Sequence, residues 1–398
     1  MTHVLTLNGG SSSIKFGLHH AGVDPRRILA GKIERIGLSG TSLTFVDSLR
    51  NQHGNQQVAA DSFESAVGFL VEWLDAHVGF ANVKAVGHRV VHGMEHRNPE
   101  LLTPPLLEEL RSISQYDPEH LPGEIRLIEA FIREVPALPQ VLCFDTAFHQ
   151  TMPRVATLLP IPRRYQSKGI RRYGFHGLSY SYLMHALTCV AGEQAATGKV
   201  ILAHLGNGAS MAAVRNGKGI DTTMGFTPSG GLPMGTRSGD LDPGVIWYLA
   251  QIEKLSPQQL SVLINQQSGL LGMSGLSSDM RDLLAHEEHD AAAAEAIDLF
   301  CYQARKSIGA FAAALGGLET LVFSGGIGEH LPPVRGRICQ GLQFLGIELD
   351  AELNAVNADV ISAQTSRVAV RVIPTDEEWM MARFVCQTLG LDAVTEQG

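Results

Sequence analysis

The sequence predicts an α/β protein of two domains that share a duplicated strand–turn–strand unit. The chain has 398 residues, which is long for a single hydrophobic core. A short apolar strand, a small polar turn and a second strand occur at residues 3–18 and again at 199–214. A third apolar run, 318–323, also ends at glycines. The recurrence indicates duplication, and the three turns together predict one nucleotide site.

The first turn, Asn8 to Ser13, has the composition of a phosphate-binding loop. Two glycines allow backbone amides to approach an anion, and hydroxyls, an amide and Lys15 add donors. An ordinary hairpin with a serine-rich turn explains this stretch equally well when it is taken alone. The two later turns favour the phosphate site.

Composition excludes several classes of protein. Hydrophobic residues at 44% and charged residues at 18% are typical of a globular protein. The net charge of −9 and the lack of a basic cluster argue against a nucleic-acid partner. Anionic substrates must then be held by a few placed arginines.

The cysteines and the apolar segments indicate a cytoplasmic protein. The five cysteines are scattered without a C-x-x-C pair, which predicts reduced, buried thiols. No secretory signal is expected, because residues 1–7 are short and lack a basic lead. The longest apolar stretch, 291–321, is interrupted by Glu295, Asp298, Arg305 and Lys306, so we expect a buried helix and no membrane partner.

The first half of the chain mixes strands and helices. Short strands are expected within 28–46, and helices are expected over 61–78, 106–113 and 123–135, the first capped by Asp61 or Ser62. Residues 140–144 form a strand that delivers Asp145 at its carboxyl end, where open α/β sheets bind ligands.

Two apparent motifs in the chain are rejected. His88, His92 and His96 have the spacing of a zinc-binding helix face, but the valines and glycines around them favour a strand. Gly192 to Lys199 resembles a P-loop, yet its glycines are one residue too far apart and a strand follows it.

The second half begins near residue 150, after which the sequence becomes rich in proline and arginine. A helix is expected over 179–190, and 227–243 forms a long Gly- and Pro-rich loop with Arg237 at its centre. Long loops in compact domains are usually functional or disordered, and the single arginine favours function. A strand over 368–373 precedes the last helix, which runs to Leu389.

Seven motifs spread over nearly the whole chain resemble the acetate kinase family. They are Asn8 to Lys15, His88 to Gly93, Phe144 to His149, Arg172 to Gly177, His204 to Ser210, Thr236 to Pro243 and Gly325 to Glu329. The resemblance implies duplicated ribonuclease-H-like domains of the actin-like ATPase type that face each other across a cleft. The implied domains are 1–149, joined by a C-terminal helix within 376–398, and a nucleotide-binding domain over 150–375.

The resemblance also implies a reaction and a set of site residues. The reaction is ATP + acetate ⇌ ADP + acetyl phosphate in a cytoplasmic homodimer, with Mg²⁺, or Mn²⁺ in its place. The implied catalytic residues are Asp145, His176 and Arg237, and the implied metal ligands are Asn8 and Glu377. The implied acyl-binding residues are Arg89, Val91, His120, Phe175 and Pro228. The implied ATP-binding residues are Lys15, His204, Leu205, Gly206, Asn207, Gly208, Asp279, Met280, Arg281, Gly326, Ile327, Gly328, Glu329 and His330.

Three questions stay open. Without the resemblance, Arg89 and Asp145 would be taken as a buried ion pair. Since a carboxylate needs no base, Asp145 is expected to orient a metal-bound water or an arginine, although the family treats it as a catalytic acid. The substrate could be propionate or butyrate instead of acetate. A different class of function, an actin-like binding module switched by nucleotide, is the other alternative to a kinase.

One residue departs from the family pattern. Where the family has an apolar leucine that helps to wall the acyl pocket, this chain has Glu119. An inward Glu119 would repel an anionic substrate, and Glu119→Leu should then lower KM for acetate. Alternatively, His120 protonates beside Glu119 and offsets the repulsion, or Glu119 turns to solvent and Leu121 fills the gap.

Overall fold

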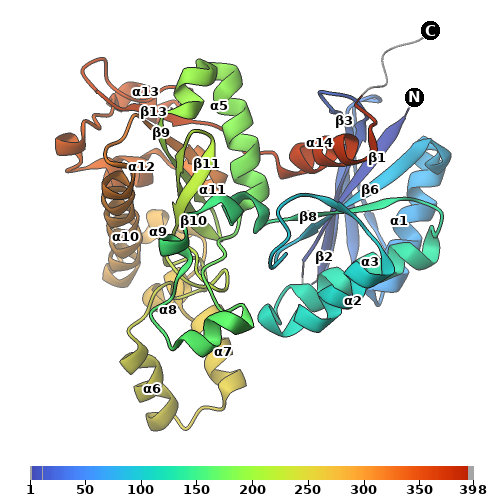
Figure 1. The fold of residues 1–398 in the computed structure, drawn as a ribbon, viewed down its shortest axis with the longest axis horizontal. Coiled ribbons are helices and arrows are strands. Elements are labelled where there is room, and N and C mark those ends of the chain that lie inside the picture. The colour runs from blue at the N-terminus through green and yellow to red at the C-terminus, as the bar shows by residue number, and fades with distance from the viewer. Residues whose placement is uncertain (1, 11, 393–398) are drawn as a thin grey trace. The chain divides into compact units, whose positions relative to one another are not determined.

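The computed structural model describes residues 2–10 and 12–392, which divide into two compact units (Figure 1). Unit 1 comprises 1–147 with 376–398, and unit 2 comprises 148–375. No helix within the described ranges is long and apolar enough to cross a membrane.

Unit 1 is built on an eight-stranded sheet of order β5-β4-β3-β2-β1-β6-β8-β7. Its strands are β1 His3–Gly9, β2 Ser13–His20, β3 Arg26–Glu34, β4 Ser42–Asp47, β5 Gln52–Gln57, β6 Val83–Val90, β7 Glu100–Leu101 and β8 Gln140–Phe144. The hairpin predicted at the start of the chain is confirmed as the antiparallel pair β1–β2, with Leu7 opposite Phe16. The parallel neighbour of β1 is β6, so the run that contains His88 is a strand, as expected.

Helices cover both faces of this sheet. They are α1 Phe63–Val78, α2 Pro104–Ile113, α3 Leu121–Glu134 and α14 Glu377–Leu389, with 3₁₀ turns at Phe80–Asn82 and Ser114–Tyr116. The α1 N-cap is Ser62, whose hydroxyl accepts the Ser65 amide. Leu5 and Leu7 pack with α1 and α3, whereas a side chain at Gly87 would meet Val385 of α14. The last helix of the chain therefore covers the face opposite to α1 (Figure 1).

Unit 2 repeats the central part of this sheet in the order β11-β10-β9-β12-β13. Its strands are β9 Lys199–Leu205, β10 Ala209–Arg215, β11 Lys218–Thr222, β12 Thr320–Ser324 and β13 Ala369–Val372. An antiparallel hairpin, β9–β10, again has a parallel strand, β12, beside its first strand. The series β11-β10-β9-β12-β13 matches β3-β2-β1-β6-β8 in order and direction, so the predicted duplication is confirmed for the sheets.

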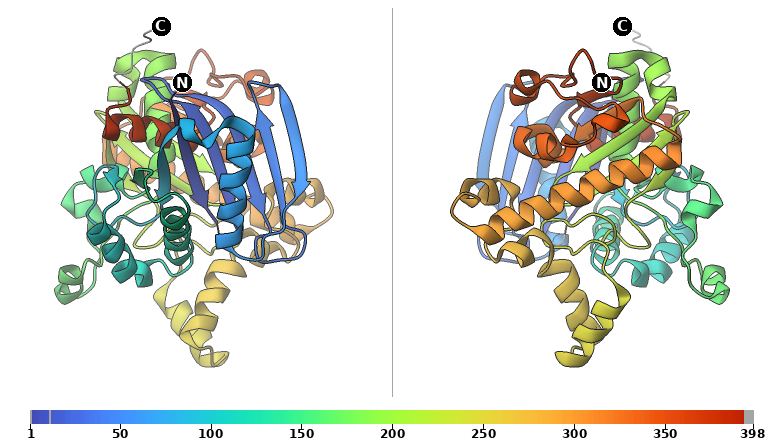
Figure 2. Two further views of the ribbon diagram at one scale, coloured as in Figure 1. Left: turned by 90° about the vertical axis from the view of Figure 1, so that its right-hand side faces the viewer. Right: turned by 90° about the vertical axis from the view of Figure 1, so that its left-hand side faces the viewer.

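The longer helices of unit 2 cover its sheet from two sides. They are α5 Gly177–Thr197, which has non-helical backbone at Gly192, and α10 Ala291–Leu315 (Figures 1 and 2). The shorter helices are α4 Arg154–Thr157, α6 Pro243–Ile252, α7 Pro257–Gln266, α8 Gly269–Ser274, α9 Met280–His286, α11 Gly325–His330, α12 Pro332–Cys339 and α13 Ala351–Ala355, with 3₁₀ turns at Ala147–Thr151, Arg163–Lys168 and Gln343–Leu345. In Figure 2 the hairpin of α6 and α7 projects from the rest of the unit.

Candidate active site

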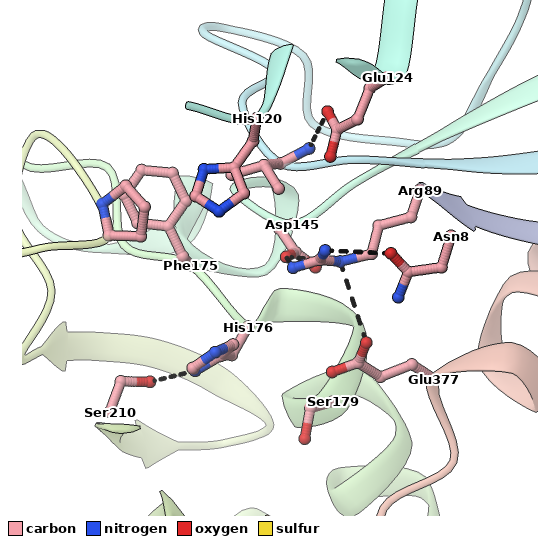
Figure 3. Close-up of polar contacts among 12 residues, drawn as sticks. Asn8, Arg89, His120, Glu124, Asp145, Phe175, His176, Ser179, Ser210 and Glu377 are labelled. Carbon is pink, nitrogen blue, oxygen red and sulfur yellow. Dashed lines mark hydrogen bonds and ion pairs between the residues drawn. The ribbon is translucent and has the colours of Figure 1, made fainter. Parts of the chain in front are cut away.

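Unit 1 brings an arginine and three oxygen-bearing side chains together at the carboxyl ends of neighbouring strands (Figure 3). Arg89 lies near the end of β6, and Asp145 follows β8 directly. Arg89 donates to Asp145 Oδ2 from Nη2 at 2.5 Å and from Nε at 3.1 Å, and Nη1 donates to Asn8 Oδ1 at 3.3 Å. Glu377, the first residue of α14, lies 3.9 Å from Arg89 Nε.

The cluster is largely closed to water, which strengthens its electrostatics. Asp145 is fully buried, and the Arg89 side chain is 17% exposed. Burial alone would lower the pKa of Arg89, but Asp145, Glu377 and Glu124 raise it above its usual value. A guanidinium has five N–H groups, so the three hydrogen bonds leave two that bond to no described residue. These two can receive a further anion.

The oxygen set around Arg89 fits an open magnesium site. Mg²⁺ usually binds one or two carboxylates, keeps several waters and takes its other ligands from substrate phosphates. Asn8 Oδ1 and the Glu377 carboxylate both lie within 4 Å of Arg89. Among the described residues there is no cluster of three or more His, Cys, Asp or Glu side chains that would enclose a metal.

The other expected residues of unit 1 lie at different distances from this cluster. Val91 is buried, and it follows Arg89 by two residues. His120 precedes α3, and its Nδ1 lies 2.9 Å from Asp117 Oδ1. Lys15 is exposed on β2, where it lines a cavity of about 410 Å³ with Glu378. It shares no hydrogen bond with the Arg89 cluster among the described residues.

The structure favours a Glu119 side chain that turns to solvent while Leu121 fills the gap. Glu119 is exposed, whereas Leu121 is fully buried in the core between α2 and α3. The carboxylate that enters this region is instead Glu124, which accepts the Val91 amide at 3.0 Å. We therefore no longer expect Glu119→Leu to lower KM for acetate.

In unit 2, His176 at the N-cap of α5 stacks on His204 of β9. The rings of His176 and His204 lie with their centroids 4.3 Å apart. His176 Nδ1 lies 2.8 Å from the hydroxyl of Ser210, and His204 Nδ1 lies 2.8 Å from the hydroxyl of Ser179. The two serines thus fix both rings through the same ring nitrogen. His176 has a positive φ of 60°, which turns the chain sharply into α5.

Arg237 lies beside this pair. A Cβ on Gly208 would lie 3.4 Å from His176 Nε2 and 3.8 Å from Arg237 Nη1, so both side chains approach the same glycine. Arg237 Nη1 donates to the Pro228 carbonyl at 3.2 Å, which ties together two parts of the 227–243 loop. Phe175 is buried next to His176, and its carbonyl lies 2.9 Å from His149 Nε2. Because Gly208 has no side chain, His176 and Arg237 can both lie close to this turn.

A cavity of about 620 Å³ opens beside the β9–β10 turn and the start of α11. Its size suits a nucleoside, and it combines backbone, apolar and charged groups. Its lining residues are Gly206, Asn207, Ser278, Asp279, Met280, Arg281, Gly326, Ile327, His330 and Leu331. Eight of the fourteen ATP-binding residues implied by the sequence are among them. Asp279 is the N-cap of α9, and hydrogen bonds from Arg281 lower its pKa.

Leu205, Gly328 and Glu329, which are also expected at the nucleotide, do not line this cavity. Leu205 and Gly328 are buried. The Glu329 Oε1 atom accepts the Gly325 amide at 2.8 Å, the Thr375 amide at 3.2 Å and the Ser324 hydroxyl at 3.3 Å. These contacts fasten the corner between β12 and α11. Gly325 has a φ of 74° and abuts the Leu205 backbone, so a side chain there would collide.

Sequence patterns missed several side chains that the structure places at these clusters. Ser179 and Ser210 carry no motif signal of their own for a histidine partner, and Ser278 and Leu331 only adjoin predicted motifs. Glu124 could be noticed only as an acid near the start of a helix, where charge is common.

The whole chain has close relatives among known proteins. Residues 3–383 match the model of the acetokinase family. An acetate kinase of Rhodopseudomonas palustris is 44% identical over 388 residues, with 96% of this chain and 97% of that protein covered. A crystal structure of Porphyromonas gingivalis acetate kinase has a TM-score of 0.89 at 37% identity, covering 98% of this chain and 100% of that one. A propionate kinase from Francisella tularensis has a TM-score of 0.91 at 34% identity, covering 96% and 99%. The duplicated sheet and the matches along nearly the full length place this chain in the acetokinase family.

Proposed function

We propose that the chain catalyses reversible phosphoryl transfer from ATP to acetate, which gives ADP and acetyl phosphate. The observation that carries this proposal is Arg89, a largely buried guanidinium with two N–H groups that bond to no described residue. A planar two-pronged donor suits the two oxygens of a carboxylate. An arginine so placed has no evident purpose in an actin-like module that only binds and releases nucleotide.

The chemistry is mainly positioning and electrostatics. The substrate carboxylate is already ionised near neutral pH, since carboxyl groups of this kind have a pKa of roughly 4 to 5. It can attack the γ-phosphorus directly, and no base has to remove a proton. Asp145 accepts two hydrogen bonds from Arg89, which supports an orienting role for this carboxylate rather than proton transfer. His176 and Arg237 would hold the oxygens of the phosphoryl group in transfer.

Asn8 and Glu377 would hold Mg²⁺ directly or through water, with Mn²⁺ as the alternative. A bound divalent cation would offset the charge of the β- and γ-phosphates. The 620 Å³ cavity would take the adenosine, with Asp279, Arg281 and the Gly326–Ile327 backbone at its wall. Both assignments rest on family membership together with the donor types present.

A coupled assay for ATP-dependent acyl hydroxamate with acetate, propionate and butyrate tests the function. We expect the highest kcat/KM with acetate, and a preference for propionate would favour the second candidate, suggested by the similar propionate kinase. Arg89→Ala should raise KM for the acid far more than KM for ATP. The exposed Arg97, changed to alanine, is the control. ATP hydrolysis without hydroxamate from any acid would instead support the nucleotide-switched module.

We also propose a cytoplasmic homodimer. In support of a dimer, the projecting helix α6 has no buried residue and exposes Val245, Trp247, Tyr248 and Ile252. A second copy would cover this apolar face. Sedimentation of the double variant Trp247→Glu and Ile252→Glu should show a monomer, and an unchanged dimer would place the interface elsewhere. In support of the cytoplasm, all five cysteines are free thiols, although Cys189 is exposed and not buried as the sequence predicts.

A further inference from the structure

A buried carboxyl group that the proposed chemistry does not use lies behind the arginine cluster. Glu124, in the first turn of α3, is 3% exposed. Its Oε2 accepts the Val91 amide at 3.0 Å, while its Oε1 is buried and has no hydrogen-bond partner among the described residues. Ionising this carboxyl group costs free energy, because the buried oxygen has lost its hydrogen bonds to water and has no protein donor in their place.

Glu124 and Asp145 hold the same strand end from two sides. The Asp145 amide donates to the Val90 carbonyl at 2.9 Å, and its side chain binds Arg89. The Val91 amide, next along the chain, donates to Glu124. Three consecutive residues are thus fixed by two acidic residues, and the first of the three, Arg89, carries the guanidinium that would bind the substrate (Figure 3).

The charges that face Glu124 are few. Arg89 faces it from β6, His120 from one helical turn earlier, and Asp117 from the preceding turn. The elements that pack on α3 from its other sides, α1, α2 and β1, do so mainly through apolar side chains. Two ion pairs also join these helices, Arg111 of α2 with Glu129 and Glu64 of α1 with Arg133, and both involve residues beyond the first turn of α3. Burial raises the pKa of Glu124 to about 7, and Arg89, the Val91 amide and His120 offset this only in part. We therefore expect this carboxyl group to change charge near neutral pH.

We propose that Glu124 is a positioning residue whose protonation state sets how strongly Arg89 binds the carboxylate substrate. This rests on the proposed function of Arg89. Neutral Glu124 accepts the hydrogen bond from the Val91 amide but carries no charge. The positive charge of Arg89 is then balanced only by Asp145, Glu377 and the substrate. Ionised Glu124 adds a third fixed carboxylate that faces the same guanidinium, and it opposes the entry of a fourth. The site then binds carboxylate substrates more tightly on the acid side of neutrality.

Kinetics across pH 6.0 to 8.5 test this for the wild type and Glu124→Gln, which keeps the shape and the acceptor for Val91. Acetate is ionised throughout, whereas ATP also titrates, so the informative quantity is the wild-type to variant ratio at each pH. We expect the ratio of KM for acetate to rise at least about threefold with pH, a small effect for charges at this range. The kcat ratio should stay flat. Glu134→Gln, an exposed acid at the end of α3, should show no such trend. A KM ratio that does not change with pH overturns the proposal.

A second measurement tests the titration of Glu124 separately from the proposed kinase activity. It uses only the wild-type protein, so it does not depend on a variant that folds. The side-chain carboxyl carbon of Glu124, followed by NMR in the free wild-type protein, should titrate near neutrality together with the Val91 amide. A midpoint near the ordinary glutamate value of about 4.3 overturns the proposal even if acetate is a good substrate. If the carboxyl titrates near neutrality but no short acid is phosphorylated, the proposed function fails, and with it the role in substrate binding.

Discussion

Arg237 is the residue whose removal should affect the chemical step most. It approaches the same glycine as His176, and its loop is tied by the Pro228 carbonyl. We expect Arg237→Ala to lower kcat about a hundredfold, as the loss of an oxyanion donor does, with a much smaller rise in KM for ATP. Arg237→Lys should restore little, because a point charge cannot reproduce a planar fork.

Steady-state kinetics with both substrates measure this effect. The control is Arg215→Ala, an exposed arginine at the end of β10 in the same unit, which should behave as wild type. If Arg237→Ala keeps more than about a tenth of the wild-type kcat, the assignment to the phosphoryl group is wrong.

His88 should make the protein sensitive to acid. It is buried on β6 and lies 2.7 Å from the Gln140 side chain, and burial lowers its pKa to about 4. In the unfolded chain its pKa is near 6.5, so below that pH the unfolded state takes up a proton that the folded state refuses. Stability is therefore lost as pH falls from about 6.5 towards 4. At roughly 1.4 kcal/mol per pKa unit, the loss is up to about 3 kcal/mol.

Urea unfolding at pH 7.5 and pH 5 tests the histidine. His88→Gln, which cannot titrate, should lose less stability on acidification than the wild type. His53→Gln, at an exposed position on β5, should follow the wild type. Equal losses in the wild type and His88→Gln would mean that His88 accepts a proton while folded.

At the scale of elements, the alternation of apolar residues and the glycines that interrupt it predicted most of the strands and turns that position the site. The strand over Gln140–Phe144 is confirmed residue for residue, because it is wholly buried and ends at a polar residue. The edge strand Gln52–Gln57 was missed, since all its residues are polar or glycine and it has no buried face.

The candidate site was only partly predictable for a physical reason. Asn8, Arg89, Asp145 and Glu377 stand at element ends with recognisable motifs, and the structure brings them together. Ser210 reaches His176 over 34 positions, and Ser179 reaches His204 over 25. These serine–histidine pairs form only when strands and helices pack together, so the local periodicity of the sequence does not predict them.

One buried arginine links the short helices next to the 620 Å³ cavity. Arg335 of α12 is fully buried and donates to the Gly328 and Glu329 carbonyls of α11, to both oxygens of Asn354 and to the Asn357 side chain. Burial lowers its pKa to about 10, so it stays charged at neutral pH. Arg335→Met should destabilise the protein by about 3 kcal/mol or more, because several buried acceptors lose their donor.

Thermal unfolding measures this, and the affinity for ADP provides a second readout. Because α11 lines the cavity, Arg335→Met should weaken ADP binding even at temperatures where the protein stays folded. Arg367→Met, at an exposed loop position of the same unit, is the matched control. Unchanged stability in Arg335→Met would contradict a supporting role for this network.

At the scale of the whole molecule, the duplication distributes the chemistry between two bodies. Unit 1 carries Arg89 with its acidic partners, and unit 2 carries His176, Arg237 and the nucleoside-sized cavity. In-line transfer needs the carboxylate oxygen and the γ-phosphorus about 3 to 3.5 Å apart, with every stabilising group aimed at one phosphoryl group. If the proposed function holds, the two units must cooperate around the same ligands, and closing over them would exclude water that otherwise hydrolyses ATP.

This reasoning predicts that the protein becomes more compact when all ligands of the transition state are present. Small-angle scattering should give a smaller radius of gyration with ADP, Mg²⁺, acetate and a planar phosphoryl mimic than for the free protein. ADP with Mg²⁺ leaves the proposed acetate site at Arg89 empty, so it should produce less compaction. Arg89→Ala should respond to the full mixture no more than the wild type does to ADP and Mg²⁺, since the acetate would lose its anchor. A radius that stays constant at saturating ligand in the wild type would mean that the two units do not close, and that water must be excluded by local loops instead.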